Sequence, residues 1–161
     1  MPTGPRLLLR NACYHIITRG NQRQQVFFDD QDYRKYISSL KKYKQKYAFL
    51  LYGFCLMPNH IHIAGEPTEP KNMAKFMHGL SLSYTAYFNK RYKKVGHLWQ
   101  SRFTSKAIVK DNYFIDCLHY IELNPVRACI VKAATEYRWS SHQERIIGKN
   151  KEYQMLDQYR I

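Results

Sequence analysis

Four short apolar segments, each bounded by turn residues, predict β-strands at 13–18, 49–55, 61–65 and 103–110. The first is rich in β-formers and stops at Arg19-Gly20-Asn21, a turn signal. The second and third are joined at Met57-Pro58-Asn59, which predicts a strand pair. Side chains along such strands point alternately to the two faces of a sheet.

Helices are predicted where apolar residues recur at three- and four-residue steps. Asp29 or Asp30 can cap the first, whose core-facing residues are Tyr33, Tyr36, Leu40, Tyr43 and Tyr47. A second begins at Asn72, with a buried stripe of Met73, Phe76, Met77, Leu80, Tyr84, Tyr87 and Phe88. A third is capped by Asp111 and ended by Pro125, because the residue before a proline avoids helical backbone.

The order strand, helix, strand, strand, helix, strand predicts an α+β fold, a ferredoxin-like βαββαβ sandwich with an additional helix that carries Tyr120. At 161 residues the chain has the length of one ordinary domain. We expect a single domain over 1–161, with a core at about 13–141 and a C-terminal tail at about 142–161. The pattern does not predict the structure of that tail.

The charge balance adds an expectation about partners. Lys and Arg number 26 against 12 Asp and Glu, for a formal net charge of +14, and aromatic residues make up 15% of the chain. Such a surface suits a polyanion, and aromatic rings among cations suit stacked, unpaired bases. With neither a membrane-spanning apolar run nor a secretion signal, we expect a cytoplasmic protein. The cysteines form no CxxC pair and are expected to be reduced core residues: Cys13, Cys55, Cys117 and Cys129.

Candidate chemistry begins with two histidines on the third predicted strand. In His60-Ile61-His62-Ile63 both histidines share one face if the isoleucines pack under the helices. Two adjacent neutral imidazoles can clamp a divalent ion. Taken alone, the pattern fits two polar residues on a half-exposed strand equally well.

A tyrosine on the last predicted helix supplies the second part of the site. Tyr120 stands beside the apolar stripe, with Asp116 four residues before it and Asn124 four residues after it on one flank. These residues offer a nucleophile and, from Asn124, a third ligand for an ion. Tyr113, one heptad earlier on nearly the same flank, is an alternative nucleophile. The competing interpretation is structural, with a hydrogen-bonded Tyr120 and an Asn124 that only ends the helix.

Together these residues predict phosphodiester cleavage. Tyr120 would attack a phosphate whose charge is offset by an ion at His60, His62 and Asn124, leaving a 5′-phosphotyrosine and a free 3′-hydroxyl. Because a phenol is protonated at neutral pH, the attack needs a proton acceptor, which the sequence does not identify. The remaining histidines have no partner spacing and are expected to be structural or at the surface: His15, His78, His97, His119 and His142.

Four stretches resemble a known family. The segment Leu56-Met57-Pro58-Asn59-His60-Ile61-His62 is similar to the HUH motif of the single-tyrosine transposases. Three more resemble the REP-associated tyrosine transposase branch, with the sequences YHIITRGN, LWQSRF and YIELNPVRA at 14–21, 98–103 and 120–128. The similarity runs from about Cys13 to Ser141, and the motifs are specific in combination.

The resemblance implies a ferredoxin-like fold, dependence on Mg²⁺ or Mn²⁺, and cutting of single-stranded DNA near a hairpin. It implies Tyr120 as nucleophile and His60, His62 and Asn124 as metal ligands. Related insertion-sequence transposases usually carry Gln at the last position and act as dimers, whereas monomers occur in the REP-associated branch, so a monomer and a homodimer both stay open. For DNA contact we expect Arg19, Arg23, Trp99, Arg102 and Lys106, although each also fits a solvated basic surface, with Trp99 in the core.

Two other functions fit parts of the sequence. Ferredoxin-like sheets with exposed aromatics also bind single-stranded RNA, so a non-catalytic single-stranded or hairpin nucleic-acid-binding protein is one alternative. It would need neither a metal nor a special tyrosine. A metal hydrolase, in which water attacks and Tyr120 is structural, would cut DNA without becoming linked to it.

Overall fold

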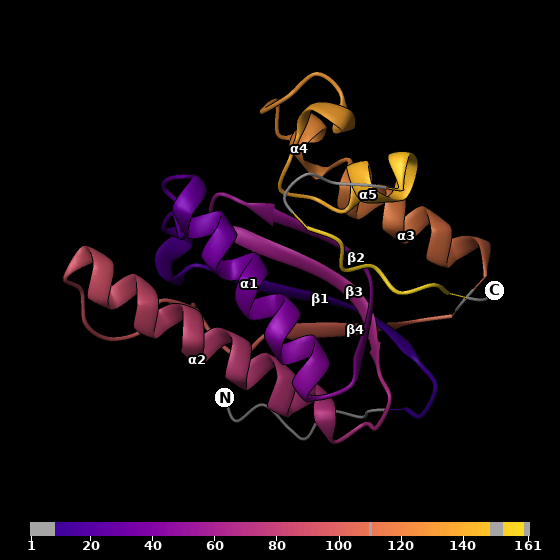
Figure 1. The fold of residues 1–161 in the computed structure, drawn as a ribbon, viewed down its shortest axis with the longest axis horizontal. Helices are drawn as coiled ribbons and strands as arrows, with labels where there is room; N and C mark the ends of the chain where they lie inside the picture. The colour runs from indigo at the N-terminus through magenta and orange to yellow at the C-terminus, as the bar shows by residue number, and fades with distance from the viewer. Residues whose placement is uncertain (1–8, 110, 149–152, 160–161) are drawn as a thin grey trace.

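The computed structural model of the chain describes residues 9–109, 111–148 and 153–159. Its elements, in chain order, are β1 (Cys13–Arg19), the short 3-10 helix η1 (Asn21–Arg23), α1 (Asp30–Lys46), β2 (Phe49–Met57), β3 (His60–Pro67), α2 (Asn72–Tyr92), β4 (Thr104–Ile108), α3 (Asn112–Glu122), α4 (Asn124–Arg127), η2 (Ala134–Glu136) and α5 (His142–Ile147). Figure 1 shows the strands as one sheet, with α1 and α2 on one face and α3, α4 and α5 on the other.

The sheet has the strand order β2-β3-β1-β4, and every neighbouring pair is antiparallel. With α1 between β1 and β2 and α2 between β3 and β4, this is the predicted ferredoxin-like βαββαβ fold. The register places His62 of β3 opposite Ile17 of β1. On the other side of β1, His15 lies opposite Lys106 of β4. Because residues opposite each other share a face, the sheet collects these side chains on the face away from α1 and α2.

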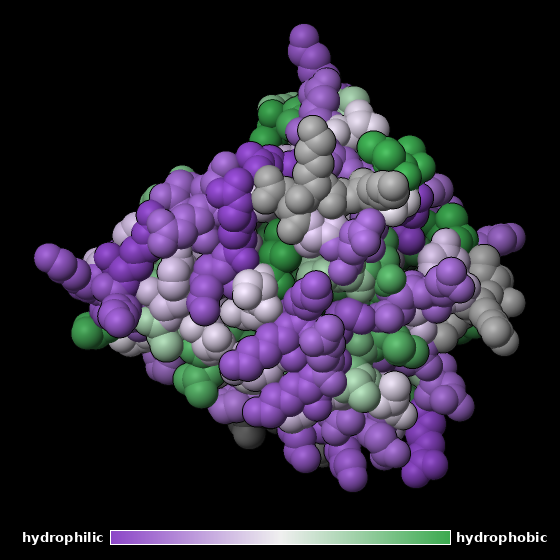
Figure 2. Space-filling model, viewed as in Figure 1, coloured by the Kyte–Doolittle hydropathy of each residue, from purple (hydrophilic) through white to green (hydrophobic). Residues whose placement is uncertain are grey.

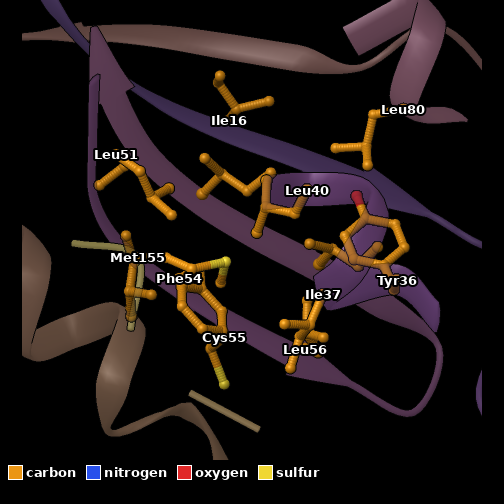
Figure 3. Packing of buried hydrophobic residues seen from close by; sticks show 14 of the residues in the cluster. Ile16, Tyr36, Ile37, Leu40, Leu51, Phe54, Cys55, Leu56, Leu80 and Met155 are labelled. Carbon is orange, nitrogen blue, oxygen red and sulfur yellow. The ribbon is translucent and has the colours of Figure 1, made fainter. Parts of the chain in front are cut away.

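The main core lies between the sheet and the pair α1 and α2. Figure 3 shows Tyr36 and Leu40 of α1 in the same buried cluster as Ile16 of β1. Asp29 caps α1 by accepting a hydrogen bond from the backbone N–H of Asp32 (3.2 Å), which settles the two predicted caps in favour of Asp29. The predicted stripe on α2 is buried at six of its seven positions: Met73, Phe76, Met77, Leu80, Tyr84 and Phe88.

The last predicted helix is divided in two. Helix α3 ends at Glu122, and one further turn, α4, begins at Asn124. The sequence predicted a single helix ended by Pro125, but Pro125 lies in the first turn of α4, where a helix needs no backbone N–H from it. Asn124 therefore begins a new turn of helix instead of ending the old one.

The C-terminal segment, which the sequence pattern did not predict, packs along β2. Tyr153 and Met155 are buried, and Figure 3 shows Met155 beside Phe54 of β2. Asp157 pairs with Leu51 through two hydrogen bonds, from its own N–H to the carbonyl of Leu51 (2.7 Å) and from the N–H of Leu51 to its carboxylate (2.8 Å). The segment therefore belongs to the packed structure.

The surface agrees with most of the expectations from composition. Figure 2 shows one face of the molecule largely covered by hydrophilic side chains. Cys13 and Cys55 are buried as predicted, whereas Cys117 is half-buried and Cys129 is exposed. The prediction fails for Cys129 because this residue lies in the turn after α4, with left-handed backbone (φ 58°).

Within the described parts of the chain, no helix has the length and apolar character needed to cross a membrane.

Candidate active site

Both histidines of the HxH segment lie on the sheet face opposite α1 and α2. They alternate with Ile61 and Ile63, which are buried in the main core as predicted. The face is not open, however, because α3 packs over β2 and β3 and leaves His62 only 3% exposed. His60 is half-buried, and the two imidazole centroids are 5.0 Å apart. The position of this pair, between the sheet and α3, is called the histidine recess.

Hydrogen bonds determine which nitrogen each imidazole presents. Nδ1 of His60 bonds Oδ1 of Asn59 (2.7 Å), whose amide nitrogen donates to the carbonyl of Arg23 (3.4 Å). The proton between His60 and Asn59 thus lies on Nδ1. Nδ1 of His62 bonds Nε2 of His15 (2.8 Å). Bonds of this kind orient metal-binding histidines, and here they leave Nε2 of His60 and of His62 as the atoms that would meet an ion.

His15, which was predicted to be structural or at the surface for lack of a partner spacing, has a partner in this site. Its ring stacks on that of His62, with centroids 5.1 Å apart and an interplanar angle of 24°, and lies 6.1 Å from the ring of Tyr120. Alternation along β1 could have indicated the face, because Ile16 points into the main core. The contact of His15 with His62, which lies opposite Ile17 on β3, depends on the strand register, and a single sequence does not fix that register.

Burial keeps these imidazoles uncharged. It lowers the pKa of His60 to about 4 and that of His62 to about 3, and the positive charge of Arg19 adds to both effects. The pKa of His15 is lowered too, first by burial and then by the charge of Lys106. Neutral imidazole is the form that binds cations, so the histidines are in their ligand form at neutral pH.

Helix α3 carries the tyrosine and is fixed to the sheet by its apolar stripe. Phe114, Leu118 and Ile121 are at most 1% exposed, and burial of such side chains stabilises a fold by about 1.5–3 kcal/mol each. Gly53 of β2 allows the close approach, because a Cβ there would lie 2.9 Å from Cδ2 of Leu118. Tyr120 lies on the flank and remains 48% exposed. The helix therefore presents this side chain at the edge of the histidine recess.

A buried carboxylate fixes the end of α3, two residues after the tyrosine. Glu122 is 1% exposed, and its Oε1 accepts hydrogen bonds from Oγ of Ser141 (2.6 Å) and Nε of Arg145 (2.9 Å). Its Oε2 lies 3.1 Å from Nδ1 of His142. His142 was predicted to be structural or at the surface, and this contact gives it a structural role. The spacing gave no signal, since its partner lies 20 residues away in the sequence.

The ring of Tyr120 stands edge-on to His62, with centroids 6.2 Å apart and an interplanar angle of 83°. Arg127 of α4 covers the tyrosine ring, with its Cζ 4.1 Å from the centroid, and donates a hydrogen bond to the Tyr120 carbonyl. Arg127 was not predicted as a site residue, although its position seven residues after Tyr120 could have indicated it. A tyrosine beside neutral imidazoles and under a guanidinium is well placed to react with a phosphate.

A cavity of about 440 Å³ opens beside the tyrosine, lined among others by His15, Lys106, Tyr113, Asp116 and Tyr120. Its volume is within the range of pockets that take small ligands, about 300–1,000 Å³. Tyr113, the alternative nucleophile, is 56% exposed and reaches the same cavity. The ring contacts with His15 and His62, however, are those of Tyr120.

Asn124 lies one turn beyond the tyrosine, and its amide nitrogen donates to the carbonyls of Tyr120 (3.2 Å) and Ile121 (3.5 Å). Oδ1 is therefore the atom of this side chain that can approach a cation. Among the described residues, no group of three or more His, Cys, Asp or Glu is placed to share an ion. An ion at His60 and His62 would thus need amide, water or phosphate oxygens to complete its ligands.

Four of the five predicted DNA-contacting residues are exposed cations: Arg19, Arg23, Arg102 and Lys106. In the sheet register, Arg19 lies opposite His60 and Lys106 lies opposite His15, so both flank the histidine recess. Arg102 lies just before β4, and the carbonyl of Arg23 accepts the hydrogen bond from Asn59. Arg19 and Lys106 therefore flank the recess, whereas Arg102 lies on the side of the sheet that carries α2.

Trp99 differs from the other four. It is half-buried, its ring lies 6.1 Å from that of Tyr84, and its Nε1 donates to the carbonyl of Ser81 (3.4 Å). The alternative interpretation of Trp99 as part of the core is therefore correct for one side of its ring.

Comparison with known proteins supplies the family. The model of the family described as "Transposase IS200 like" matches residues 9–124, a stretch that contains His60, His62, Tyr120 and Asn124. The chain belongs to the IS200-like transposase family. A Haemophilus influenzae protein with the provisional name REP-associated tyrosine transposase is 30% identical over 115 residues. That match covers 65% of this transposase-family chain and 65% of the relative.

Solved structures agree with this placement. The fold matches a REP-associated tyrosine transposase solved with a REP hairpin, with a TM-score of 0.77, 19% identity, and coverage of 100% of this chain and 99% of the other. It also matches a protein of Deinococcus radiodurans provisionally described as a transposase, with a TM-score of 0.51, 19% identity, and coverage of 76% and 96%. The transposase family that the sequence motifs predicted is confirmed by the family model. The Haemophilus relative and the first of the solved structures are both named as REP-associated tyrosine transposases.

Proposed function

We propose that this chain cuts and rejoins single-stranded DNA beside a hairpin, with Tyr120 as the nucleophile and a divalent cation, Mg²⁺ or Mn²⁺, at His60, His62 and Asn124. The observation that carries the proposal is the position of Tyr120. This half-exposed tyrosine stands edge-on to the buried, neutral imidazole of His62 and has the guanidinium of Arg127 over its ring. Family membership supports the same reaction class.

The donor set fits a divalent cation. The partners Asn59 and His15 occupy Nδ1 of the two ligand histidines, which favours ligation through Nε2. Amide, water and phosphate oxygens suit both Mg²⁺ and Mn²⁺. Imidazole is preferred by transition metals, so the two histidines favour Mn²⁺ over Mg²⁺. When bound, such an ion offsets negative charge that develops on the phosphate.

The residues of the chain supply the rest of the reaction. Oη of Tyr120 loses its proton to water and forms a bond to phosphorus as the bond from phosphorus to the 3′ oxygen breaks. The 3′ oxygen takes up a proton from water and leaves as a hydroxyl. Arg127 adds positive charge beside the reacting phosphate, where it stabilises the transition state. The reverse attack by a 3′-hydroxyl rejoins the strand and frees the tyrosine. Arg19 and Lys106 hold the backbone on either side through phosphate contacts.

The substrate follows from charge and from the relatives. With a net charge of +14 the chain suits nucleic acid, and one structural relative was solved with a REP hairpin. We infer the same class of substrate here, a hairpin with an unpaired flank. Tyr120 and the histidines belong to one chain in this arrangement, which is compatible with a monomer.

Covalent capture tests the proposal. Single-stranded DNA with a hairpin, taken from repeats that surround the gene and labelled at the 3′ end, is incubated with Mn²⁺ or with EDTA and run on a denaturing protein gel. We expect a labelled protein–DNA adduct that needs the metal and disappears in Tyr120→Phe. Tyr113→Phe is the matched control, because this tyrosine lies on the same helix, is exposed and lines the same cavity.

Each other outcome assigns a different function. Loss of the adduct in Tyr113→Phe but not in Tyr120→Phe would move the nucleophile to Tyr113. DNA that is cut but never linked would make water the nucleophile. DNA that is bound and neither cut nor linked would leave a nucleic-acid-binding protein.

A further inference from the structure

A second and larger cavity lies on the other side of the sheet, between α2 and the loop that precedes β4. Its volume is about 660 Å³. Met77, Ser81 and Leu82 of α2 form one wall, and Leu98, Trp99 and Phe103 form the other. Leu82 is 60% exposed, although it is apolar. None of the residues proposed for catalysis lines this cavity, so it needs a separate explanation.

The lining combines flat apolar surface with polar groups at the rim. Trp99 is held as a rigid wall, because its ring packs against Tyr84 and its Nε1 bonds the carbonyl of Ser81. Ser81, His78 and Arg102 supply hydrogen-bond donors and a positive charge. A heteroaromatic base attached to a phosphate matches this mixture, since aromatic walls stack on bases and cations bind the backbone.

Backbone hydrogen bonds connect the loop that lines this cavity to the histidine recess. The N–H of Gln100 donates to the carbonyl of Arg19 (2.8 Å), and the N–H of Asn21 donates to the carbonyl of Leu98 (2.7 Å). These bonds tie the loop to the end of β1, where Arg19 lies opposite His60. Because β4 is the edge strand, a DNA strand that passes Lys106 on one face can continue around this edge past Arg102.

We propose that this cavity binds one unpaired base of the single strand that flanks the hairpin. The inference rests on the proposed function, because it assigns a base subsite to the same substrate. The base stacks on the wall that contains Trp99, and Arg102 contacts its phosphate. The cavity thereby sets which flank position reaches Tyr120.

Two sets of changes test the subsite, one in the protein and one in the DNA. Ser81→Leu fills the cavity from α2, and Ser83→Leu is its matched control, because Ser83 is also half-buried on α2 but does not line the cavity. The probes are DNA hairpins with unpaired flanks of oligothymidylate, oligodeoxyadenylate or oligodeoxycytidylate. Each flank also carries one abasic residue, placed at each position in turn. Binding is measured by fluorescence anisotropy in EDTA.

We expect one abasic position to weaken binding to the wild type by about 5- to 100-fold, as loss of a stacked base does. Ser81→Leu should bind the intact probe as weakly as the wild type binds the abasic probe, and the abasic residue should not weaken its binding further. Ser83→Leu should behave as the wild type. Thr85→Leu, which enters the same cavity, serves if Ser81→Leu has an altered melting temperature.

Three results would overturn the proposal. The first is that no abasic position weakens binding to the wild type. The second is that the abasic effect persists in both cavity-filling variants. The third is that these variants change self-association in sedimentation and leave DNA binding intact, which would make a second copy of the chain the occupant. The covalent assay is independent of these results. An adduct formed with no effect of the Ser81 change refutes the subsite alone, whereas base-dependent binding without an adduct refutes cleavage alone.

Discussion

Removal of the Glu122 carboxylate should both destabilise the protein and misplace the tyrosine. Glu122→Ala deletes three side-chain interactions, with Ser141, Arg145 and His142, from a position that is 1% exposed. Ser141 keeps its bonds to the backbone of Phe54, but Arg145 loses its carboxylate partner while its side chain is only 19% exposed.

The cost can be bounded from these contacts. Removal of one partner of a buried ion pair costs about 3–5 kcal/mol, because the other charge stays buried. Glu122→Gln keeps the volume and part of the hydrogen bonding, and we expect it to cost about 1–3 kcal/mol. Asp116→Ala removes an exposed carboxylate from the same helix and should change stability by no more than about 0.5 kcal/mol.

The free energy of unfolding is measured by urea denaturation for all three variants, and adduct formation is measured at a temperature where each is folded. Because Glu122 lies between Tyr120 and Asn124, its anchorage should matter for the reaction as well as for stability. We expect Glu122→Ala to form the adduct more slowly per folded molecule. If Glu122→Ala and Asp116→Ala are equally stable, the carboxylate does not hold α3 as described.

Three further predictions concern the recess and its surroundings. Burial lowers the pKa of His62 to about 3 in the folded protein, below the pKa of about 6.5 in the unfolded chain. The free energy of unfolding should therefore be highest above pH 6.5 and fall by about 2–5 kcal/mol towards pH 4, because the unfolded state takes up protons. Urea denaturation at each pH should show a weaker dependence on pH for His62→Gln. His15→Gln should weaken Mn²⁺ binding about 10- to 100-fold in an electron paramagnetic resonance titration, whereas His97→Gln should bind Mn²⁺ as the wild type does. If the two variants bind Mn²⁺ with equal affinity, His15 does not orient His62. Lys106→Ala should reduce the slope of log affinity for single-stranded DNA against log salt by about 0.7–1, whereas an identical loss in Lys42→Ala would mean that Lys106 is ordinary surface charge.

Local patterns predicted the elements and their caps well. The alternation in His60-Ile61-His62-Ile63 predicted which side chains share a face, because period-two alternation is a property of the strand itself. Asp111 was identified as a helix cap, and Asp29 as one of two candidates with Asp30, because a cap acts on the next few residues.

Features that depend on distant contacts were not predictable in this way. His15 joins the recess only through the pairing of β1 with β3, and Glu122 is surrounded by residues from α5 and the turn before it. The break at Leu123 was missed because proline excludes helix from the residue before it and yet is favoured in the first turn of a new one. Only the fold decides between those two effects.

The two edges of the sheet differ in what they offer to another molecule. Along β2 the chain satisfies the outer backbone groups itself, with bonds from Leu56 to Trp139 (2.8 Å), from Ser141 to Phe54 (2.9 Å) and from Asp157 to Leu51 (2.7 Å). A second copy therefore finds no unpaired strand there on which to extend the sheet. The opposite edge, β4, is five residues long and carries Lys106, and short charged edges resist strand pairing. Both edges of the sheet thereby protect the protein from joining its neighbours sheet to sheet and aggregating.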